Sequence, residues 1–115
     1  MATIPLERIQ TGSSRAFVSR WEALQNGDDG EPLKFVQYTD KSVQVYGTFG
    51  VGGSLRFEGS NDGTNWAVLT DPQGNDLNLT TSKIEMVTEA TLYVRPVVTA
   101  GDGTTSLSVL VLMKE

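Results

Sequence analysis

Short apolar stretches, separated by turn-forming residues roughly every 8 to 12 positions, restrict the fold of this 115-residue chain more than any other feature. In residues 104–113 every second position is apolar: Leu107, Val109, Val111 and Met113. That period of two is the side-chain alternation of a β-strand. The β-branched residues Val, Ile and Thr fill 28 of the 115 positions and favour strands over helices. We therefore predict an all-β domain, an antiparallel β-sandwich of Ig-like or small jelly-roll type with about seven to eight strands.

The C-terminal stretch 104–113 is also apolar on its second face, because Leu110 and Leu112 occupy intervening positions. A strand with one side in water normally carries polar residues on that side. Either both faces are covered within the domain, or one face meets another subunit. Residues 91–99 are predicted to pair with this stretch, and Pro96 places them at a sheet edge or beside a bulge, since proline lacks the amide donor.

The middle of the chain supplies further strands of the same kind. Residues 33–38 and 42–49 are predicted to be consecutive strands, because apolar and polar positions alternate in them. The glycine-rich residues 50–53 predict a hairpin from 42–49 into the strand that follows. The pair Asp62-Gly63 stands between two apolar runs and predicts another hairpin turn.

The first residues do not follow this pattern. Residues 1–15 mix isolated apolar residues with a proline and a Thr-Gly-Ser-Ser cluster, so we expect an extended N-terminal arm followed by a single β-sandwich domain at 16–115. The arm is either a frayed terminus or a segment that lies along a neighbouring subunit. Residues 16–24 are ambiguous, because the spacing of Phe17 and Trp21 fits one face of a helix or of a strand.

Composition excludes most catalytic and metal chemistry. The chain has no Cys and no His, which removes thiolate nucleophiles, imidazole bases, disulfides and the usual zinc ligands. It contains no basic stripe for nucleic-acid binding, no run of roughly 18 apolar residues and no readable export signal. We expect a soluble protein that is not an enzyme and binds neither nucleic acid nor membrane.

Charge is distributed unevenly along the chain. The formal net charge is -5, from nine basic and 14 acidic residues. The first 25 residues are slightly basic, with a net charge of +1 from Arg8, Arg15, Arg20, Glu7 and Glu22. The remainder therefore carries -6. This division predicts different partners for the two parts.

Carboxylates offer two alternatives to a purely structural role. Three loop aspartates could supply oxygen ligands to a hard cation such as calcium: Asp28, Asp29 and Asp102. Their spacing matches no complete calcium-binding loop, and Asp beside Gly is an ordinary turn former. Three glutamates lie on or beside strands, where a pair could do acid–base work: Glu58, Glu85 and Glu89. No other catalytic group accompanies them, so we expect no catalytic residue, no metal and no cofactor.

Aromatic side chains are the remaining candidates for a binding surface. Tyr46 should be exposed, because it alternates with apolar Val45, and Trp21 is the second candidate for a surface aromatic. Such rings stack on sugars or anchor protein interfaces. Trp66 is expected in the core. A glycan is therefore an alternative ligand.

Two stretches resemble small virion proteins encoded among the head genes of tailed phages. The first is residues 43–69, with VYGTF at 45–49, the glycine turn and FEGSNDGTNW at 57–66, and the second is residues 93–107 (YVRPVVTAGDGTTSL). The resemblance implies a capsid decoration or cement protein, a β-rich and often oligomeric unit on the outer lattice that bridges neighbouring major capsid protein subunits. The hairpin at residues 59–66 is also similar to one in discoidin-like carbohydrate-binding domains.

On this resemblance we expect a virion structural protein on the outer capsid surface, which stabilises the capsid. Its expected partners are the major capsid protein and further copies of itself, with a trimer favoured. Contacts with the capsid or another subunit are expected at Ile4, Leu6, Arg8, Ile9, Arg15, Leu110 and Leu112. A carbohydrate-binding β-sandwich module and a tail or fibre component are the alternatives.

Overall fold

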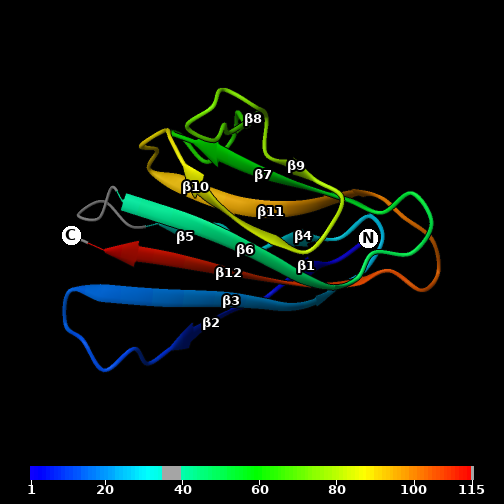
Figure 1. The fold of residues 1–115 in the computed structure, drawn as a ribbon, viewed down its shortest axis with the longest axis horizontal. Helices are drawn as coiled ribbons and strands as arrows, with labels where there is room; N and C mark the ends of the chain where they lie inside the picture. The colour runs from blue at the N-terminus through cyan, green and yellow to red at the C-terminus, as the bar shows by residue number, and fades with distance from the viewer. Residues whose placement is uncertain (35–39, 115) are drawn as a thin grey trace.

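The computed structural model describes residues 1–34 and 40–114 and confirms the prediction of an all-β sandwich (Figure 1). Its longer strands are β2 (Leu6–Ile9), β3 (Ala16–Leu24), β6 (Asp40–Thr48), β7 (Ser54–Ser60), β10 (Lys83–Val87), β11 (Tyr93–Ala100) and β12 (Ser106–Lys114). Two-residue strands extend the sheets: β1 (Thr3–Ile4), β4 (Asp29–Gly30), β5 (Leu33–Lys34), β8 (Ala67–Val68) and β9 (Asn78–Leu79). No helix in the described part of the chain is long and apolar enough to cross a membrane.

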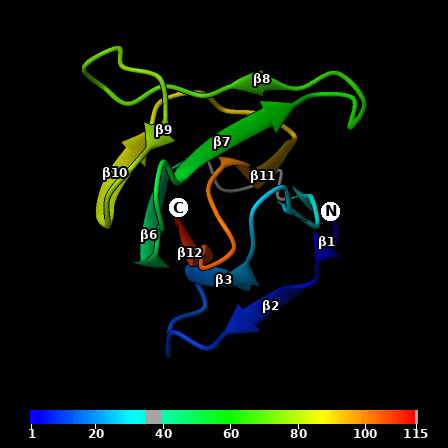
Figure 2. The ribbon, with the colours of Figure 1, turned by 90° about the vertical axis from the view of Figure 1, so that its right-hand side faces the viewer.

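The strands form two layers, which Figure 2 shows end-on. One sheet has five strands in the order β10-β6-β12-β3-β2. The other has seven, in the order β1-β4-β11-β7-β8, with β5 beside β11 and β9 beside β7. Neighbouring strands are antiparallel, apart from the parallel pair β1 and β4. The five-stranded sheet is centred on β12, which pairs with β6 along its whole length and with β3 on its other side.

The core lies between the two sheets and consists of the inward-facing residue of each alternating pair. The largest fully buried side chains are Trp21, Phe57, Leu24, Leu55, Leu77, Leu107, Val43, Val45, Val94, Val98, Val109 and Val111. Full burial of an aliphatic side chain contributes about 1.5–3 kcal/mol to folding, so these side chains hold the two sheets together. The indole Nε1 of Trp21 donates a hydrogen bond to the carbonyl of Glu31 at 2.9 Å, which satisfies its only polar atom.

Two predicted strand pairings were wrong: that of 42–49 with the strand after residues 50–53, and that of 91–99 with 104–113. In both cases the connection crosses from one sheet to the other. Strand β6 belongs to the five-stranded sheet and β7 to the other; β12 and β11 are divided in the same way. The alternation of inward and outward residues is the same whether a chain turns within a sheet or crosses to the other, so sequence periodicity does not distinguish these cases. The crossing loops lie together, since Val51 N–H donates to Asp102 Oδ2 at 2.9 Å and Thr105 Oγ1 donates to the carbonyl of Phe49 at 2.7 Å.

The N-terminal segment is extended, as expected, but residues 3–9 pack against the body of the same chain instead of leaving it as an arm. Strand β1 pairs with β4 in the seven-stranded sheet, and β2 pairs with β3 at the edge of the other. Pro5 lies between these strands, where the chain passes from one layer to the other. Ile4 and Leu6 pack against the core, which explains why the segment folds back.

Pro96 lies within β11, beside an interruption in the neighbouring strand. On that side β5 pairs with Tyr93 and Val94, and β4 pairs with Val97, so Pro96 falls between them. A missing amide donor is tolerated at such a break. The end of β4 lies close to Pro96, because a Cβ on Gly30 would lie 2.7 Å from both Pro96 Cδ and the Trp21 ring. The bulge in β11 lies later, between Val98 and Ala100.

Other local predictions have clear outcomes. Residues 16–24 form strand β3, which settles the ambiguity between helix and strand. The turn at Asp62-Gly63 does join an antiparallel pair, β7 and β8, and Gly63 has a φ of 77°. The Asp62 carboxylate accepts the amides of Thr64 and Asn65, which lowers its pKa. Of the predicted strand at 33–38, Leu33–Lys34 form β5, and the rest lies outside the described residues.

Candidate assembly surface

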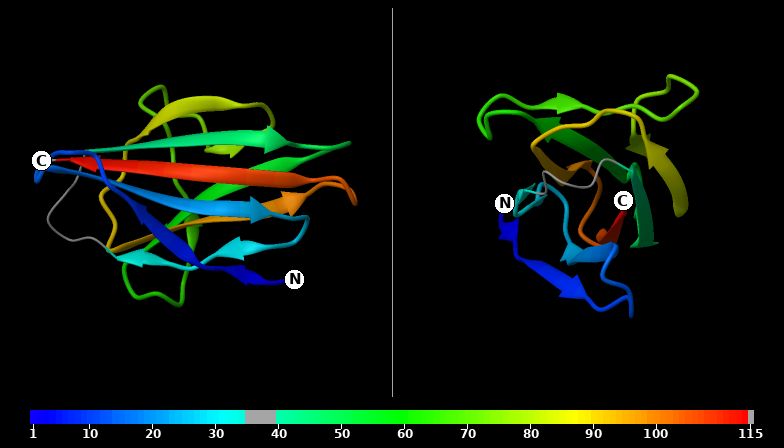
Figure 3. Two further views of the ribbon diagram at one scale, coloured as in Figure 1. Left: turned by 90° about the horizontal axis from the view of Figure 1, so that it is seen from below. Right: turned by 90° about the vertical axis from the view of Figure 1, so that its left-hand side faces the viewer.

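The outer face of the five-stranded sheet carries apolar residues from one edge strand to the other. Strand pairing aligns its outward residues in two rows, which run Ile9–Val18–Leu112–Ser42–Met86 and Glu7–Arg20–Leu110–Gln44–Ile84. We call the six apolar members of these rows the apolar face: Ile9, Val18, Ile84, Met86, Leu110 and Leu112. Figure 3 shows β3, β12 and β6, which carry the middle of this face, lying side by side.

The apolar face is accessible to solvent in this chain. Ile84 and Met86 on the edge strand β10 are 60% and 53% exposed, and the other four members are half-buried. A shallow groove of about 220 Å³ runs over the middle strands between Val18 and Ile84, with Leu110 and Leu112 along it. Since no other part of the described chain covers this groove, its apolar walls face water.

Charged residues border the apolar face and occur in pairs of opposite sign. Arg20 Nη2 lies 3.1 Å from Glu7 Oε2, and Arg20 Nη1 lies 3.8 Å from Glu22 Oε1. The hydrogen bond to Glu7 raises the pKa of the Arg20 guanidinium. At the opposite end of the strands, Lys114 is directly across from Asp40. The border therefore has almost no net charge.

The structure brings together three of the seven contact residues expected from the sequence: Ile9, Leu110 and Leu112 all lie on the apolar face. The sequence left open whether both faces of β12 are covered within the domain. In the single chain only the side that carries Val109 and Val111 is covered by the other sheet. Ile4 and Leu6 are half-buried and pack against the core, so they lie apart from the apolar face, and their role as contacts stays a prediction.

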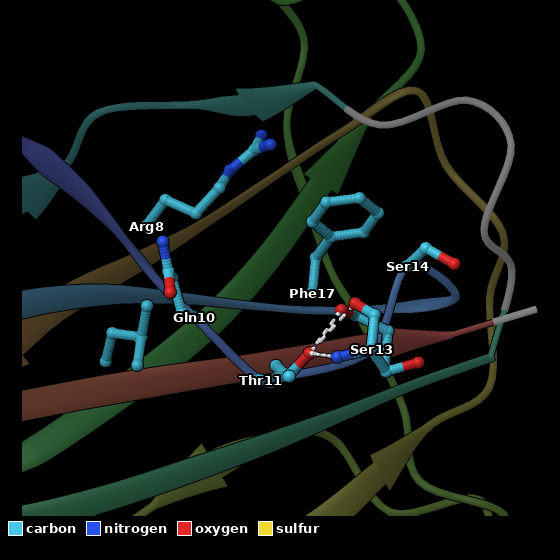
Figure 4. Close-up of a pocket in the computed structure, with 9 residues that line it drawn as sticks. Arg8, Gln10, Thr11, Ser13, Ser14 and Phe17 are labelled. Carbon is cyan, nitrogen blue, oxygen red and sulfur yellow. Dashed lines mark hydrogen bonds between the residues drawn. The ribbon is translucent and has the colours of Figure 1, made fainter.

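The two predicted basic contacts lie at the β2–β3 hairpin. The guanidinium carbon of Arg8 is 4.9 Å from the centre of the Phe17 ring, and both side chains project to the same side of the hairpin (Figure 4). Residues 8–14, 16 and 17 line an open hollow of about 380 Å³, where Thr11 Oγ1 donates to the carbonyl of Ala16 at 2.8 Å. Arg15 is exposed on the hairpin turn.

The outer face of the seven-stranded sheet has different chemistry. Arg95 is central: its Nη2 lies 3.1 Å from Glu58 Oε1, its Nη1 lies 3.6 Å from Asp29 Oδ2, and its guanidinium carbon lies 4.1 Å from the Trp66 ring centre. Arg56 Nε lies 2.9 Å from the second oxygen of Glu58. We call these five residues the ion-paired face. Each charge on it has a partner within the chain.

The aromatic predictions have opposite outcomes. Tyr46 is 37% exposed and lies on the outer side of β6, next to the border charges of the apolar face. Trp21 is fully buried, so its prediction as a surface aromatic was wrong: it faces inward from β3, where the core needs a large side chain. Trp66, expected in the core, is only half-buried and stacks on Arg95 outside it. Tyr93 lies beside it, with ring centres 6.4 Å apart.

The carboxylates that suggested catalysis or metal binding are engaged separately. Glu58 is paired with arginines, Glu85 with Lys83 at 3.3 Å, and Glu89 accepts hydrogen bonds from the amide and hydroxyl of Thr70. Among the loop aspartates, Asp28 accepts the amides of Ala2 and Gln25, and Asp102 is the loop link described above. Across residues 1–34 and 40–114, no three acidic groups are grouped so that they could hold a metal ion.

Sequence reasoning missed Val18, Ile84 and Met86 as members of the apolar face. The signal for Ile84 and Met86 was present, since they alternate with Glu85 on a short segment, but their exposure depends on β10 being an edge strand. Which strand lies at an edge is set by pairing between distant segments. Local periodicity along the chain does not show this pairing.

No family model matches this chain, and no curated protein matches it. Solved structures do share its fold. The SPBc2 prophage-derived protein YomS has a TM-score of 0.68 and 12% sequence identity, over 90% of this chain and 97% of that one. An RmlC-like cupin protein from Desulfovibrio desulfuricans has a TM-score of 0.54 and 12% identity, over 97% and 82%. Peruvianin-I, a cysteine peptidase from Thevetia peruviana latex, has a TM-score of 0.53 and 12% identity, over 96% and 60%. At this identity the likeness is one of fold alone.

Proposed function

We propose that this chain is a structural protein of a tailed-phage virion, which decorates the outer capsid surface and stabilises it by bridging neighbouring major capsid protein subunits. It works as a homo-oligomer with the major capsid protein as its partner. In this role the protein needs a rigid body and contact surfaces, and its many copies add weak contacts through avidity.

The apolar face is the observation that carries the proposal. A protein that functions as a lone monomer rarely exposes a group of six apolar side chains on one sheet face, because contiguous apolar surface favours association. The face is broad and shallow, whereas small-molecule sites are enclosed clefts. Its chemistry therefore suits a protein surface as partner.

The fold likeness supports a phage-related protein. YomS is described as prophage-derived, and the likeness extends over almost the whole of both chains. The fold does not decide between structural and catalytic roles, since a cysteine peptidase chain shares it. A structural role is favoured by the side chains, because Glu58, Glu85 and Glu89 are held in separate ion pairs or hydrogen bonds.

The proposal is tested with the phage that encodes the chain. Capsids from a mutant phage that lacks this gene are mixed with the purified protein, and cryo-electron microscopy locates the added density. We expect ordered density on the outer capsid lattice and a higher temperature of capsid disruption. Density on the tail or fibres, or no binding at all, would contradict the proposal, and tail density would support the alternative of a tail or fibre component.

A carbohydrate-binding module is the second candidate function. Exposed Tyr46 and the half-buried pair Trp66 and Tyr93 are rings of the type that stack on sugars. One face of Trp66 is already covered by Arg95, which leaves Tyr46 as the freer ring. A glycan array tests this candidate: glycan binding that is lost in Tyr46→Ala supports it, and an array without signal rules it out.

A further inference from the structure

We infer that the apolar face packs against the same face of a second copy of this chain, to form a face-to-face dimer with two-fold symmetry. The inference names the partner of the assembly surface and rests on that part of the proposed function. Three properties of the face favour a second copy: its area, its charge and its geometry.

The area is sufficient for a specific dimer. Strands lie about 4.8 Å apart and rise about 3.4 Å per residue, so five strands with a nine-residue centre give a face of roughly 20 by 25 Å. Contact over this face removes about 500 Å² from each copy, or about 1,000 Å² in total, which is the lower limit for a stable specific interface. Interfaces near this limit belong to weak, transient complexes, so we expect a concentration-dependent dimer with a dissociation constant of roughly micromolar order.

The charge distribution selects a second copy over a partner of opposite charge. Two copies with a net charge of -5 each repel one another unless they meet where charge is lowest. None of the six members of the apolar face is charged. At its border Arg20 forms an ion pair with Glu7, and Asp40 and Lys114 are cross-strand neighbours of opposite charge. A basic partner would gain little here, whereas an identical face is matched in both polarity and charge.

The geometry of the sheet supports a two-fold contact. Leu110 and Leu112 lie on β12, the middle strand, so a two-fold axis that lies in the contact plane over this strand brings both leucines of one copy against those of the other. Sheets that pack face to face lie about 10 Å apart with nearly aligned strands. Ser42 and Gln44 flank the leucines and can bond across the contact. An isologous contact of this kind closes as a dimer, in place of the trimer expected from the resemblance.

Sedimentation velocity of the full chain tests the inference, over concentrations from about 1 to 200 µM, which bracket a micromolar dissociation constant. The test variant is Ile84→Lys with Met86→Lys, because both side chains are more than half exposed and their replacement spares the core. The matched control is Val51→Lys, which alters an 83% exposed apolar side chain outside this face. Circular dichroism and thermal unfolding report whether each variant remains folded.

We expect a concentration-dependent dimer for the wild type and the control, and a dissociation constant at least about 30-fold weaker for the double variant, because four lysines would enter one contact. A wild type that stays monomeric overturns the inference. So does a trimer, or a dimer that the double variant leaves intact.

Capsid binding separates this inference from the proposed function. If the protein dimerises through the apolar face but leaves capsids undecorated, the proposed function fails and the inference stands. If the wild type is monomeric and still decorates capsids, the inference fails and the function stands.

Discussion

The outer faces of the two sheets have the same strand alternation and opposite chemistry. On the seven-stranded sheet, Arg95 is held by Glu58, Asp29 and Trp66, so the polar groups find partners within the chain. On the five-stranded sheet, the corresponding outward positions of β12 are Leu110 and Leu112, which face water. The polar groups of one face have partners within the monomer, whereas the other face leaves apolar groups in water, which association would remove.

This difference separates contributions to folding from contributions to association. Removing a residue from the ion-paired face leaves a charge without its partner in the folded chain. Removing a residue from the apolar face costs little in the monomer, because its side chains are already partly exposed. Substitutions on the ion-paired face should therefore change mainly the free energy of unfolding, and substitutions on the apolar face should change mainly self-association.

The largest effect on folding is expected from Arg95→Ala. This substitution removes both Arg95 contacts to Glu58, whose side chain is 11% exposed, and leaves Arg56 as its remaining arginine partner. It should lower the free energy of unfolding by about 2 kcal/mol. Leu112→Ala on the other sheet should lower it by about 1 kcal/mol or less. Urea denaturation of dilute protein measures both. A larger loss for Leu112→Ala would contradict the comparison, and Arg95→Ala should leave self-association unchanged.

A smaller loss is expected from Trp66→Leu. The guanidinium of Arg95 lies 4.1 Å from the indole ring, a cation–π contact that contributes about 1 kcal/mol at a partly exposed site. Trp66→Phe retains a ring and is the matched control. Thermal unfolding should place the Leu variant below the Phe variant; equal midpoints would mean that Arg95 gains nothing from the ring.

The smallest effect is expected from acid. The hydroxyl of Thr104 and the amide of Val51 lower the pKa of Asp102 to about 2, against about 3.9 for a free aspartate. A carboxyl with a lowered pKa stabilises the fold fully above about pH 4 and loses this contribution as the pH falls toward 2. The midpoint of thermal unfolding should fall in that window, and less steeply in Asp102→Asn.

The control for this loss of stability in acid is Asp76→Asn, which alters an exposed aspartate. If the unfolding midpoint of Asp102→Asn falls with pH as steeply as that of the wild type, protonation of Asp102 is not what destabilises the fold in acid. The apolar face has no titratable member, and the net charge of -5 falls toward zero at the sequence pI of about 4.6, so self-association should persist or tighten between pH 7 and pH 5. Loss of the dimer in that range would mean that the border charges hold it.

Periodicity in the sequence was sufficient to predict the fold class, because inward residues such as Val43 and Val109 repeat every second position whatever the topology. It did not predict that β6 and β7 belong to different sheets, since pairing is decided by contacts between distant segments. The folding back of residues 3–9 was missed for the same reason. Its anchors, Ile4 and Leu6, look like isolated apolar residues until the core they join is known.

The candidate surface was predicted only in part. The two-sided apolar pattern of β12 correctly identified Leu110 and Leu112 as unusual. Trp21 was misplaced, because a tryptophan in an ambiguous segment fits core and surface equally well until the side facing the second sheet is known. The outer position of Trp66 depends on Arg95, which is 29 residues away in the sequence.

The central claim is that the apolar face is covered when the protein assembles. The chain has no cysteine, so Ser42→Cys places a single thiol within this face, and Thr99→Cys places one on the other sheet. The measurement is the rate of thiol alkylation in dilute and in concentrated protein. We predict that alkylation at position 42 slows at least about tenfold on concentration, the factor expected when about 90% of chains are dimeric, whereas position 99 is unaffected. Equal rates at both positions at every concentration would contradict the account.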